Sequence, residues 1–345
     1  MTDDTLHHYD DRFSSRYIDL LGERVGGRAI ACSDQWFAEC DNLVKPGRGV
    51  FKAGLFVATG QWMDGWESRR SFGRKSRTGD DFDWCILRLG ITGIVRGFDI
   101  DTNHFRGNAP EFVAVEAANV IGEVDHDTQW TELLAKSASG AHCQNLYDCE
   151  SDQQWTHLRL KMYPDGGIAR FRAYGEPRIN RQNFIDGELV DLASVANGGR
   201  GTDASDRFFS SPSNLVMPGR GVNMGDGWET KRRRDNNNDW AVVELGIAGT
   251  LRKIVVDTAH FKGNFPDSMS LQATSVKPGQ QPDDATVWQT VVAQCPLYAD
   301  REHLFIEQIE VDAEAEFTHV RINIYPDGGI SRLRVFGFPN WQCLL

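Results

Sequence analysis

The sequence predicts an all-β protein made of two tandem, homologous domains, each an antiparallel sandwich or jelly roll. The first observation is a hexapeptide, Tyr-Pro-Asp-Gly-Gly-Ile, that occurs identically at 163–168 and at 325–330. An identical hexapeptide with matched flanks indicates a duplicated structural unit. The second observation is that short alternating apolar runs, punctuated by Gly, Pro, Asp and Asn, recur in both halves, whereas helical periodicity is weak. Such runs are typical of antiparallel sandwiches.

Aligning the two copies sets the domain boundaries. The expected parts are an N-terminal arm, a first repeat, a polar linker, a second repeat and a C-terminal tail, at residues 1–17, 18–177, 178–189, 190–339 and 340–345. A chain of 345 residues suits two domains of about 150 to 170 residues each.

The offset between matched positions changes along the chain. Ile18 matches Val190, an offset of 172, whereas Asp64 matches Asp226, an offset of 162, so the first repeat holds ten additional residues around 51–63. All such length changes fall between matched blocks. We therefore expect loops there, because loops tolerate insertions better than strands do.

Strands are expected wherever short apolar or alternating runs end at Gly or at polar turn residues. These runs are 85–89, 97–101, 112–117 and 157–162 in the first repeat and 241–245, 253–257 and 319–324 in the second. Two weak helical patterns, at 14–21 and 34–42, predict short helices. In a sandwich the strands form the scaffold and loops at the strand ends carry the site.

The composition excludes several classes of partner. The net charge is -12, so the surface is acidic, which argues against nucleic acid and anionic membranes. No apolar run approaches the roughly 18 residues of a spanning helix, and the polar N-terminus has no signal-peptide core. The seven cysteines are odd in number and include no C-x-x-C pair, which favours free thiols in a reducing cytoplasm.

The block Asp-Gly-Trp-Glu at 64–67 recurs at 226–229 and is followed by basic residues in both repeats. A turn that carries a carboxylate beside arginines could bind an anionic substrate and supply an acid–base group. Trp66 and Trp228 would add a binding wall. The alternative is a turn with exposed ion pairs, which contribute little. The candidates from this block are Glu67, Arg69, Arg70, Glu229, Arg232 and Arg233.

The block Asp-Thr-x-His-Phe-x-Gly-Asn at 101–108 recurs at 257–264, directly after an expected strand. It places a carboxylate, an imidazole and an amide in one loop, and an imidazole carries protons near neutral pH. The alternative is an Asp or Asn that caps the turn, with a half-buried histidine. The spacing of Asp and His would permit a metal pair, but no third ligand stands at a defined spacing, so no metal or other cofactor is expected.

The repeated hexapeptide predicts a tight turn, because proline fixes φ and Asp-Gly favours a turn. It could be only a hairpin between two strands. Arg170 and Arg332, just beyond the turn, are its candidate functional members. His157 and His319 begin strands and are assigned a structural role. The repeated Gly-Arg-Gly at 47–49 is too short to indicate a phosphate cradle.

At these blocks the chain resembles the allantoicase family. The matching segments are Ser33-Asp34-x-Trp36-Phe37-Ala38, 64–70, 101–108 and 161–172, together with their counterparts in the second repeat. The resemblance spans the chain from about Ile18 to Pro339. It implies two jelly-roll repeats similar to galactose-binding-like domains. It also implies hydrolysis of allantoate to ureidoglycolate and urea, the reaction of a hydrolase acting on linear amidine-type C–N bonds in allantoin and purine degradation.

The chemistry of allantoate fits the repeated polar residues. The catalytic candidates are Glu67, Asp101, Glu229, Asp257 and His260. The substrate-binding candidates are Arg69, Arg70, Asn108, Arg170, Arg232, Arg233, Asn264 and Arg332. His260 is preferred to His104, because the family does not always keep a histidine at the position of His104.

Two other functional classes compete with this one. A non-catalytic carbohydrate-binding or small-ligand-binding sandwich is disfavoured by the expected cytoplasmic location and free cysteines. A cupin-like metal enzyme lacks its His-x-His…Glu…His ligands. The expected partner is a small molecule, and the open sheet edges leave a homo-oligomer as a further expectation. The sequence does not decide whether one repeat or both are catalytic.

Overall fold

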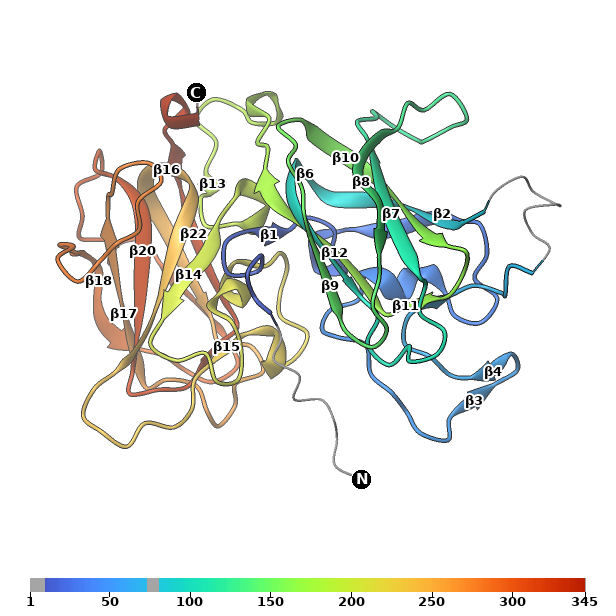
Figure 1. Cartoon of the computed structure of the whole chain (residues 1–345). Coiled ribbons are helices and arrows are strands. Elements are labelled where there is room, and N and C mark those ends of the chain that lie inside the picture. Colours follow the sequence, from blue (N-terminus) through green and yellow to red (C-terminus); the bar gives the residue numbers. More distant parts are fainter. Residues whose placement is uncertain (1–9, 73–80, 345) are drawn as a thin grey trace. The chain divides into compact units, whose positions relative to one another are not determined.

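The computed structural model describes residues 10–72 and 81–344, and it divides into two compact units, Met1–Arg178 and Ile179–Leu345. Figure 1 shows that each unit is built almost wholly of strands, and the only helices among the described residues are short 3-10 turns. The predicted all-β class and the two homologous sandwich units are therefore confirmed. No helix of the described residues is long and apolar enough to cross a membrane.

The first unit contains one antiparallel sheet of eight strands that folds into two layers. Its strands are β1 (Ile18–Asp19), β2 (Arg28–Cys32), β6 (Asp83–Asp101), β7 (Phe112–Ala118), β8 (Thr131–Ala138), β9 (Gln144–Asp148), β10 (Gln154–Tyr163) and β12 (Arg170–Pro177). Their order is β1-β12-β6-β10-β7-β8, and β2 and β9 also pair with β6. The first half of β6 pairs with β2 and β10, and its second half pairs with β9 and β12. Strand β6 thus belongs to both layers.

The second unit repeats this arrangement strand for strand. Its strands are β13 (Val190–Asp191), β14 (Arg200–Ala204), β16 (Asp239–Asp257), β17 (Ser268–Thr274), β18 (Gln289–Pro296), β19 (Glu302–Phe305), β20 (Glu316–Tyr325) and β22 (Arg332–Pro339). Their order is β13-β22-β16-β20-β17-β18, with β14 and β19 also on β16. The duplication read from the sequence is therefore a duplication of the whole topology.

The runs 85–89 and 97–101, expected as separate strands, are parts of the single 19-residue strand β6, and the runs 241–245 and 253–257 are likewise parts of the 19-residue strand β16. Gly90 does not end the strand. A side chain there would place its Cβ 2.3 Å from the carbonyl oxygen of Val25, so the glycine allows the strand to pass close to another backbone. The register on β10 jumps between Arg88 and Gly93, which is where the strand crosses from one layer to the other.

The two predicted short helices are also wrong. Residues 14–21 form a turn that leads into β1, because Ile18 pairs with Gly175 and the sheet takes up its backbone polar groups. Within 34–42 only the end is helical, where the 3-10 turn η2 (Cys40–Val44) begins. The preceding residues are extended and Ala38 bridges to Glu67.

Short ribbons and turns complete the two units. They are β3 (Phe56–Val57), β4 (Gly60–Gln61), β5 (Trp66–Glu67), β11 (Gly167–Ile168), β15 (Trp228–Glu229) and β21 (Gly329–Ile330), with 3-10 turns η1 (Glu23–Val25), η3 (Arg181–Asn183), η4 (Val195–Asn197), η5 (Pro212–Val216), η6 (Met224–Asp226) and η7 (Trp341–Leu344). The pair β3–β4 lies within the insertion of the first repeat.

Trp66 and Trp228 belong to the cores and do not form the binding wall that the sequence suggested. Both are fully buried. Each indole N–H donates to a backbone carbonyl, Trp66 to Asp34 at 2.8 Å and Trp228 to Asp206 at 3.0 Å. The large apolar surface of a tryptophan stabilises the fold when buried, provided that its N–H finds a partner, and both conditions hold here.

Candidate active site

Two short ribbons bring together blocks that lie about a hundred positions apart in the sequence. In the first unit β5 pairs with β11, so that Glu67 faces Gly167 and Trp66 faces Ile168. In the second unit β15 pairs with β21 in the same way. A side chain at Gly167 would overlap the ring of Phe105, since its Cβ would lie 2.0 Å from Cε1. The glycine of the hexapeptide therefore lets the ribbon pack directly on the loop that follows β6.

The aspartate of the hexapeptide turn anchors the segment after each Glu. Asp165 accepts a hydrogen bond from the backbone N–H of Ser71 at 2.6 Å, and Asp327 accepts one from the N–H of Arg233 at 2.8 Å. The repeated turn is therefore more than a hairpin connection, because it anchors the residue that follows Arg70 or Arg232 in each unit.

Glu67 and Asn108 are joined by a hydrogen bond across the ribbon. The Asn108 side chain donates from Nδ2 to Glu67 Oε1 at 2.8 Å. Glu67 is half-buried, and this burial raises its pKa, as does the negative charge of Asp165. The Asn108 hydrogen bond and the positive charge of Arg70 oppose the increase. In the second unit the Asn264 amide donates to Glu229 Oε1 in the same manner. In each unit, the predicted Glu and the predicted Asn are therefore in direct contact.

Arg70 and Arg232 are the arginines that remain available for a ligand. They occupy equivalent positions, both are exposed, and among the described residues neither guanidinium has a hydrogen-bond or ion-pair partner. The positive charge of Arg70 lowers the pKa of Glu67, so this charge acts on the carboxylate. An unengaged guanidinium next to a half-buried carboxylate is suited to bind an anionic ligand.

Arg69 and Arg233 are engaged by carboxylates of the fold. Arg69 forms an ion pair with Asp34 at 2.6 Å and lies 5.3 Å from the ring centre of Trp36. Arg233 contacts Asp239 at 2.5 Å and Asp235 at 3.0 Å. Their principal role in this structure is to hold the segment after β5 or β15 against its own unit.

Arg170 and Arg332 form buried ion pairs. Arg170 is 4% exposed, and its Nη2 donates to Asp64 Oδ2 at 2.8 Å. Arg332 is 3% exposed, and its Nη2 donates to Asp226 Oδ2 at 2.8 Å. In each case Nη1 also donates to the backbone carbonyl of the same aspartate. Each arginine therefore holds the first residue of an Asp-Gly-Trp-Glu block, Asp64 or Asp226, in place.

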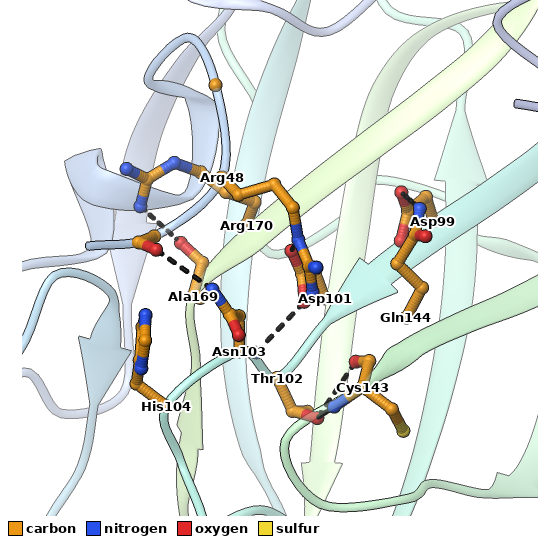
Figure 2. Close-up of polar contacts among 12 residues, drawn as sticks. Arg48, Asp99, Asp101, Thr102, Asn103, His104, Cys143, Gln144, Ala169 and Arg170 are labelled. Carbon is orange, nitrogen blue, oxygen red and sulfur yellow. Dashed lines mark hydrogen bonds and ion pairs between the residues drawn. The ribbon is translucent and has the colours of Figure 1, made fainter. Parts of the chain in front are cut away.

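Asp101 and Asp257 are buried and paired with arginines that the sequence reasoning passed over. Arg48 donates from Nε and Nη2 to the two oxygens of Asp101, both at 2.8 Å, and Arg220 contacts Asp257 at 3.2 Å. Figure 2 shows Arg48 reaching Asp101, while Arg170 turns the other way toward the carbonyl of Ala169. The recurrence of Gly-Arg-Gly in both repeats was the signal that could have identified these arginines.

The histidine loops adopt the left-handed conformation. His104 has φ 69° and His260 has φ 70°, values that non-glycine residues adopt rarely. The carbonyl of Gly49 accepts a hydrogen bond from Asn103 Nδ2 at 2.9 Å. The matching carbonyl of Gly221 lies 2.7 Å from His260 Nε2. The same backbone position, Gly49 or Gly221, is therefore bound by side chains of the histidine loop in both units.

The candidates form two sets in each unit. The outer set is the Glu–Asn pair with the arginine three residues after the Glu, namely Glu67, Asn108 and Arg70 or Glu229, Asn264 and Arg232. The inner set is the Asp–Arg pair with the histidine loop, namely Asp101, Arg48 and His104 or Asp257, Arg220 and His260. Among the described residues, no hydrogen bond or ion pair connects Glu67 to the inner set. Nor does any group of three or more His, Cys, Asp or Glu among them lie close enough to hold a metal ion.

His157 and His319, for which the sequence favoured a structural role, are each 2% exposed within β10 and β20. A ring nitrogen of each lies 2.9 Å from the hydroxyl of the preceding threonine. Both lie inside the sheet.

Comparison with known proteins gives one consistent result. A family model described as the allantoicase repeat matches residues 18–178 and 190–340. Allantoicase from Dictyostelium discoideum is 44% identical over 332 residues, which cover 94% of this chain and 87% of that protein. A probable allantoicase from Pseudomonas fluorescens strain Pf0-1 is 44% identical over 326 residues, which cover 93% and 96%. The crystal structure of allantoicase from Saccharomyces cerevisiae superimposes with a TM-score of 0.79 at 36% identity, covering 95% and 96% of the two chains.

Proposed function

This chain belongs to the allantoicase family, and from that premise we propose that each repeat hydrolyses allantoate at its Glu–Asn–Arg set. The enzyme is a hydrolase that converts allantoate and water to ureidoglycolate and urea. The observation that carries the assignment of the site is the matched hydrogen bond between Asn108 and Glu67 and between Asn264 and Glu229. Arg70 and Arg232 follow Glu67 and Glu229 by three residues, and neither guanidinium has a partner among the described residues.

Arg70 and Arg232 would bind the carboxylate of the substrate. Allantoate carries one carboxylate and two ureido groups on a single carbon. A guanidinium group binds a carboxylate through two parallel N–H···O bonds, which fixes the orientation of the ligand as well as its position. The other predicted arginines, Arg69, Arg170, Arg233 and Arg332, are occupied by Asp34, Asp64, Asp239 and Asp226.

Asn108 and Asn264 would hold a ureido group. The contact with Glu67 uses one N–H of the Asn108 amide, and an asparagine side chain has a second N–H and a carbonyl oxygen. A ureido group presents N–H donors and a carbonyl acceptor, so it complements what remains of the amide. The same contact fixes the orientation of the Glu67 carboxylate toward the bound substrate.

Glu67 would transfer the proton, first as an acid and then as a base. The raised pKa of Glu67 favours its carboxylic acid form, which can protonate the ureido nitrogen that leaves. The lone pair of the remaining ureido nitrogen expels urea and leaves an imine-like carbon. Water adds to that carbon, and the Glu67 carboxylate takes a proton from this water. The product is ureidoglycolate, and the acid form of Glu67 is restored.

In the inner set, Asp101 and Asp257 would hold arginines in place, and His260 would contact the substrate. Both oxygens of Asp101 are already bound to Arg48, and one of them also accepts the backbone N–H of Asn103 at 2.9 Å. We therefore assign proton transfer to the glutamates and assign the aspartates to holding Arg48 and Arg220. His260 keeps one ring nitrogen at the Gly221 carbonyl, which leaves the other for the substrate.

The test is replacement of the glutamates. In Glu67→Gln and Glu229→Gln, each single variant should keep about half of the urea-release rate, and the double variant should lose about 10²- to 10⁴-fold, the usual value of one acid–base group. Glu176→Gln is a matched control, because this residue pairs with Arg96 near the surface. Full activity in both single variants and in the double variant would remove the glutamates from the mechanism.

We extend the proposal to the setting of the enzyme. The net charge of -12 and the free thiols of the six described cysteines support a cytoplasmic location and argue against nucleic acid as a partner. The reaction as written uses only protein groups and water, so no cofactor is proposed. The edge strands β8 and β18 are where a homo-oligomer would extend the sheets.

A further inference from the structure

The left-handed histidine loops are held by different side chains in the two repeats. In the first unit the backbone N–H of His104 donates to His142 Nδ1 at 2.8 Å, across 38 positions of the chain. In the second unit the backbone N–H of His260 donates to Asp300 Oδ1 at 2.8 Å, across 40 positions. One repeat therefore uses an imidazole where the other uses a carboxylate.

His142 and Asp300 occupy the same place in the duplicated fold. Trp130 matches Trp288 at an offset of 158, and the same offset takes His142 to Asp300. Both residues have positive φ, 57° and 51°. A threonine hydroxyl binds each of their loops: Thr102 donates to the carbonyls of Gly140 and Cys143, and Thr258 donates to those of Tyr298 and Arg301.

We propose that His142 and Asp300 are positioning residues for the histidine loops of the two sites, and that their difference makes the first site sensitive to mild acid and the second resistant. The proposal rests on the proposed function for its effect on activity. The contact itself can be tested without any substrate.

The sensitivity follows from the chemistry of the two acceptors. A neutral imidazole accepts at Nδ1 only when its proton sits on Nε2, and an imidazolium has N–H groups at both positions and cannot accept. Protonation of His142 therefore breaks the bond from His104. A carboxylate continues to accept down to its own pKa, and the hydrogen bond from the His260 N–H lowers the pKa of Asp300 further.

Other charges surround these contacts in both units. Burial lowers the pKa of His104, the charges of Arg106 and Arg48 lower it further, and Asp101 opposes them. The His104 and His142 rings lie 5.5 Å apart, and the His104 ring also contacts Phe51 at 5.8 Å. Lys262 and Arg220 are the cations that face Asp300. These effects favour the neutral form of the His104 ring, and in this structure the His104 backbone N–H donates to His142 Nδ1.

Hydrogen exchange of selectively ¹⁵N-histidine-labelled protein tests the contact directly. The protection factor of the His104 amide, corrected for intrinsic exchange, should fall about tenfold between pH 8 and pH 5, the loss expected for one hydrogen bond. The protection of the His260 amide should not change over this range. Equal protection of the His104 amide at both pH values would overturn the proposal.

Exchanging the acceptors tests the assignment of the effect. In His142→Asp the His104 amide should stay protected at pH 5, and in Asp300→His the His260 amide should lose protection at pH 5. Asp300→Asn, which keeps a carbonyl acceptor, should behave as the wild type. If His142→Asp does not fold, the wild type and the two Asp300 variants still decide the matter.

The effect on catalysis is read in enzymes with one working site. In a Glu229→Gln background, His142→Asp should extend the acid side of the kcat profile to lower pH, and His126→Asp, at an exposed histidine, should not. An unchanged profile together with the expected exchange data would refute the positioning role while leaving the contact. If Glu67→Gln and Glu229→Gln do not affect urea release, the proposed function fails, and the exchange result stands separately.

Discussion

Asn108 Nδ2 and Glu67 Oε1 lie 2.8 Å apart, although the two residues are 41 positions apart in the sequence. The contact exists because β11 draws the segment of Glu67 onto the loop that follows β6. Its counterpart, between Asn264 and Glu229, is formed by a second copy of the same ribbon and loop. A polar pair that the fold builds twice, at the ends of matched strands, is the feature on which the proposed chemistry depends.

Replacement of the free arginines should weaken substrate binding. A lysine at position 70 or 232 keeps the charge but loses the bidentate geometry, so Arg70→Lys with Arg232→Lys should raise KM by about 10- to 100-fold, as expected for losing a hydrogen bond to a charged group. The measurement is steady-state urea release over a range of allantoate concentrations. Arg252→Lys is the control, because that arginine lies outside the candidate site, where it pairs with Glu314 and donates to the carbonyl of Ala313. An unchanged KM in the double variant would show that the carboxylate is bound elsewhere.

Loss of a buried carboxylate should destabilise the first unit. Asp64→Asn removes the partner of Arg170, which is 4% exposed, and leaves an uncompensated buried charge. Such losses cost about 3 to 5 kcal/mol. The midpoint of denaturant-induced unfolding should fall accordingly. Asp152→Asn, which breaks a surface ion pair with Arg96, should change stability by about 0 to 1 kcal/mol. Similar shifts in the two variants would contradict the structural role of the Asp64–Arg170 pair.

The pKa of Glu67 predicts how its replacement affects stability at different pH values. Burial raises the pKa of Glu67 in the folded state, so the folded protein binds this proton more tightly than the unfolded chain does. The contribution of this group to stability is therefore present at low pH and is lost as pH rises through the folded pKa. Glu67→Gln should melt at or above the wild-type temperature at pH 7, and the difference should shrink below about pH 4. A variant that melts well below the wild type at pH 7 would contradict the direction of the shift.

Much of the fold could be read from the sequence, because duplicated motifs and strand punctuation are local signals. The repeated hexapeptide located both ribbons, and the Asp, Glu and Asn residues of the matched blocks do lie at strand ends. The errors came from burial, which a single sequence shows poorly. Trp66 looked like a binding wall and is a core residue, and Gly90 looked like the end of a strand that in fact continues to Asp101.

The individual arginines could not be assigned from the sequence for a related reason. Arg69 and Arg70 are adjacent and chemically identical, yet Arg69 is bound to Asp34 whereas Arg70 has no partner among the described residues, a difference that depends on where the chain turns. Arg48 was passed over because its partner, Asp101, is 53 positions away. Only the fold brings them together.

Removal of metal ions should leave activity unchanged. The proposed reaction moves its proton through Glu67 or Glu229 and uses protein hydrogen bonds to hold the substrate. Urea release after prolonged dialysis against a chelator, and again after addition of divalent cations, should equal that of the untreated enzyme. Loss of activity on chelation, restored by one particular cation, would require the mechanism to be revised to include that ion.

Each chain should bind two molecules of allantoate. Every member of the outer set in the first repeat, Glu67, Asn108 and Arg70, has an equivalent in the second, with the same hydrogen bond and with an exposed arginine that has no partner in the part of the chain that the structure describes. The variant Glu67→Gln with Glu229→Gln should not turn the substrate over, so calorimetric titration with allantoate can measure binding alone. The stoichiometry should be about two, and it should fall to about one when Arg70→Ala is added, because a guanidinium clamp is lost in one repeat only. A stoichiometry of one before that addition would show that the second set no longer binds the substrate and only supports the fold.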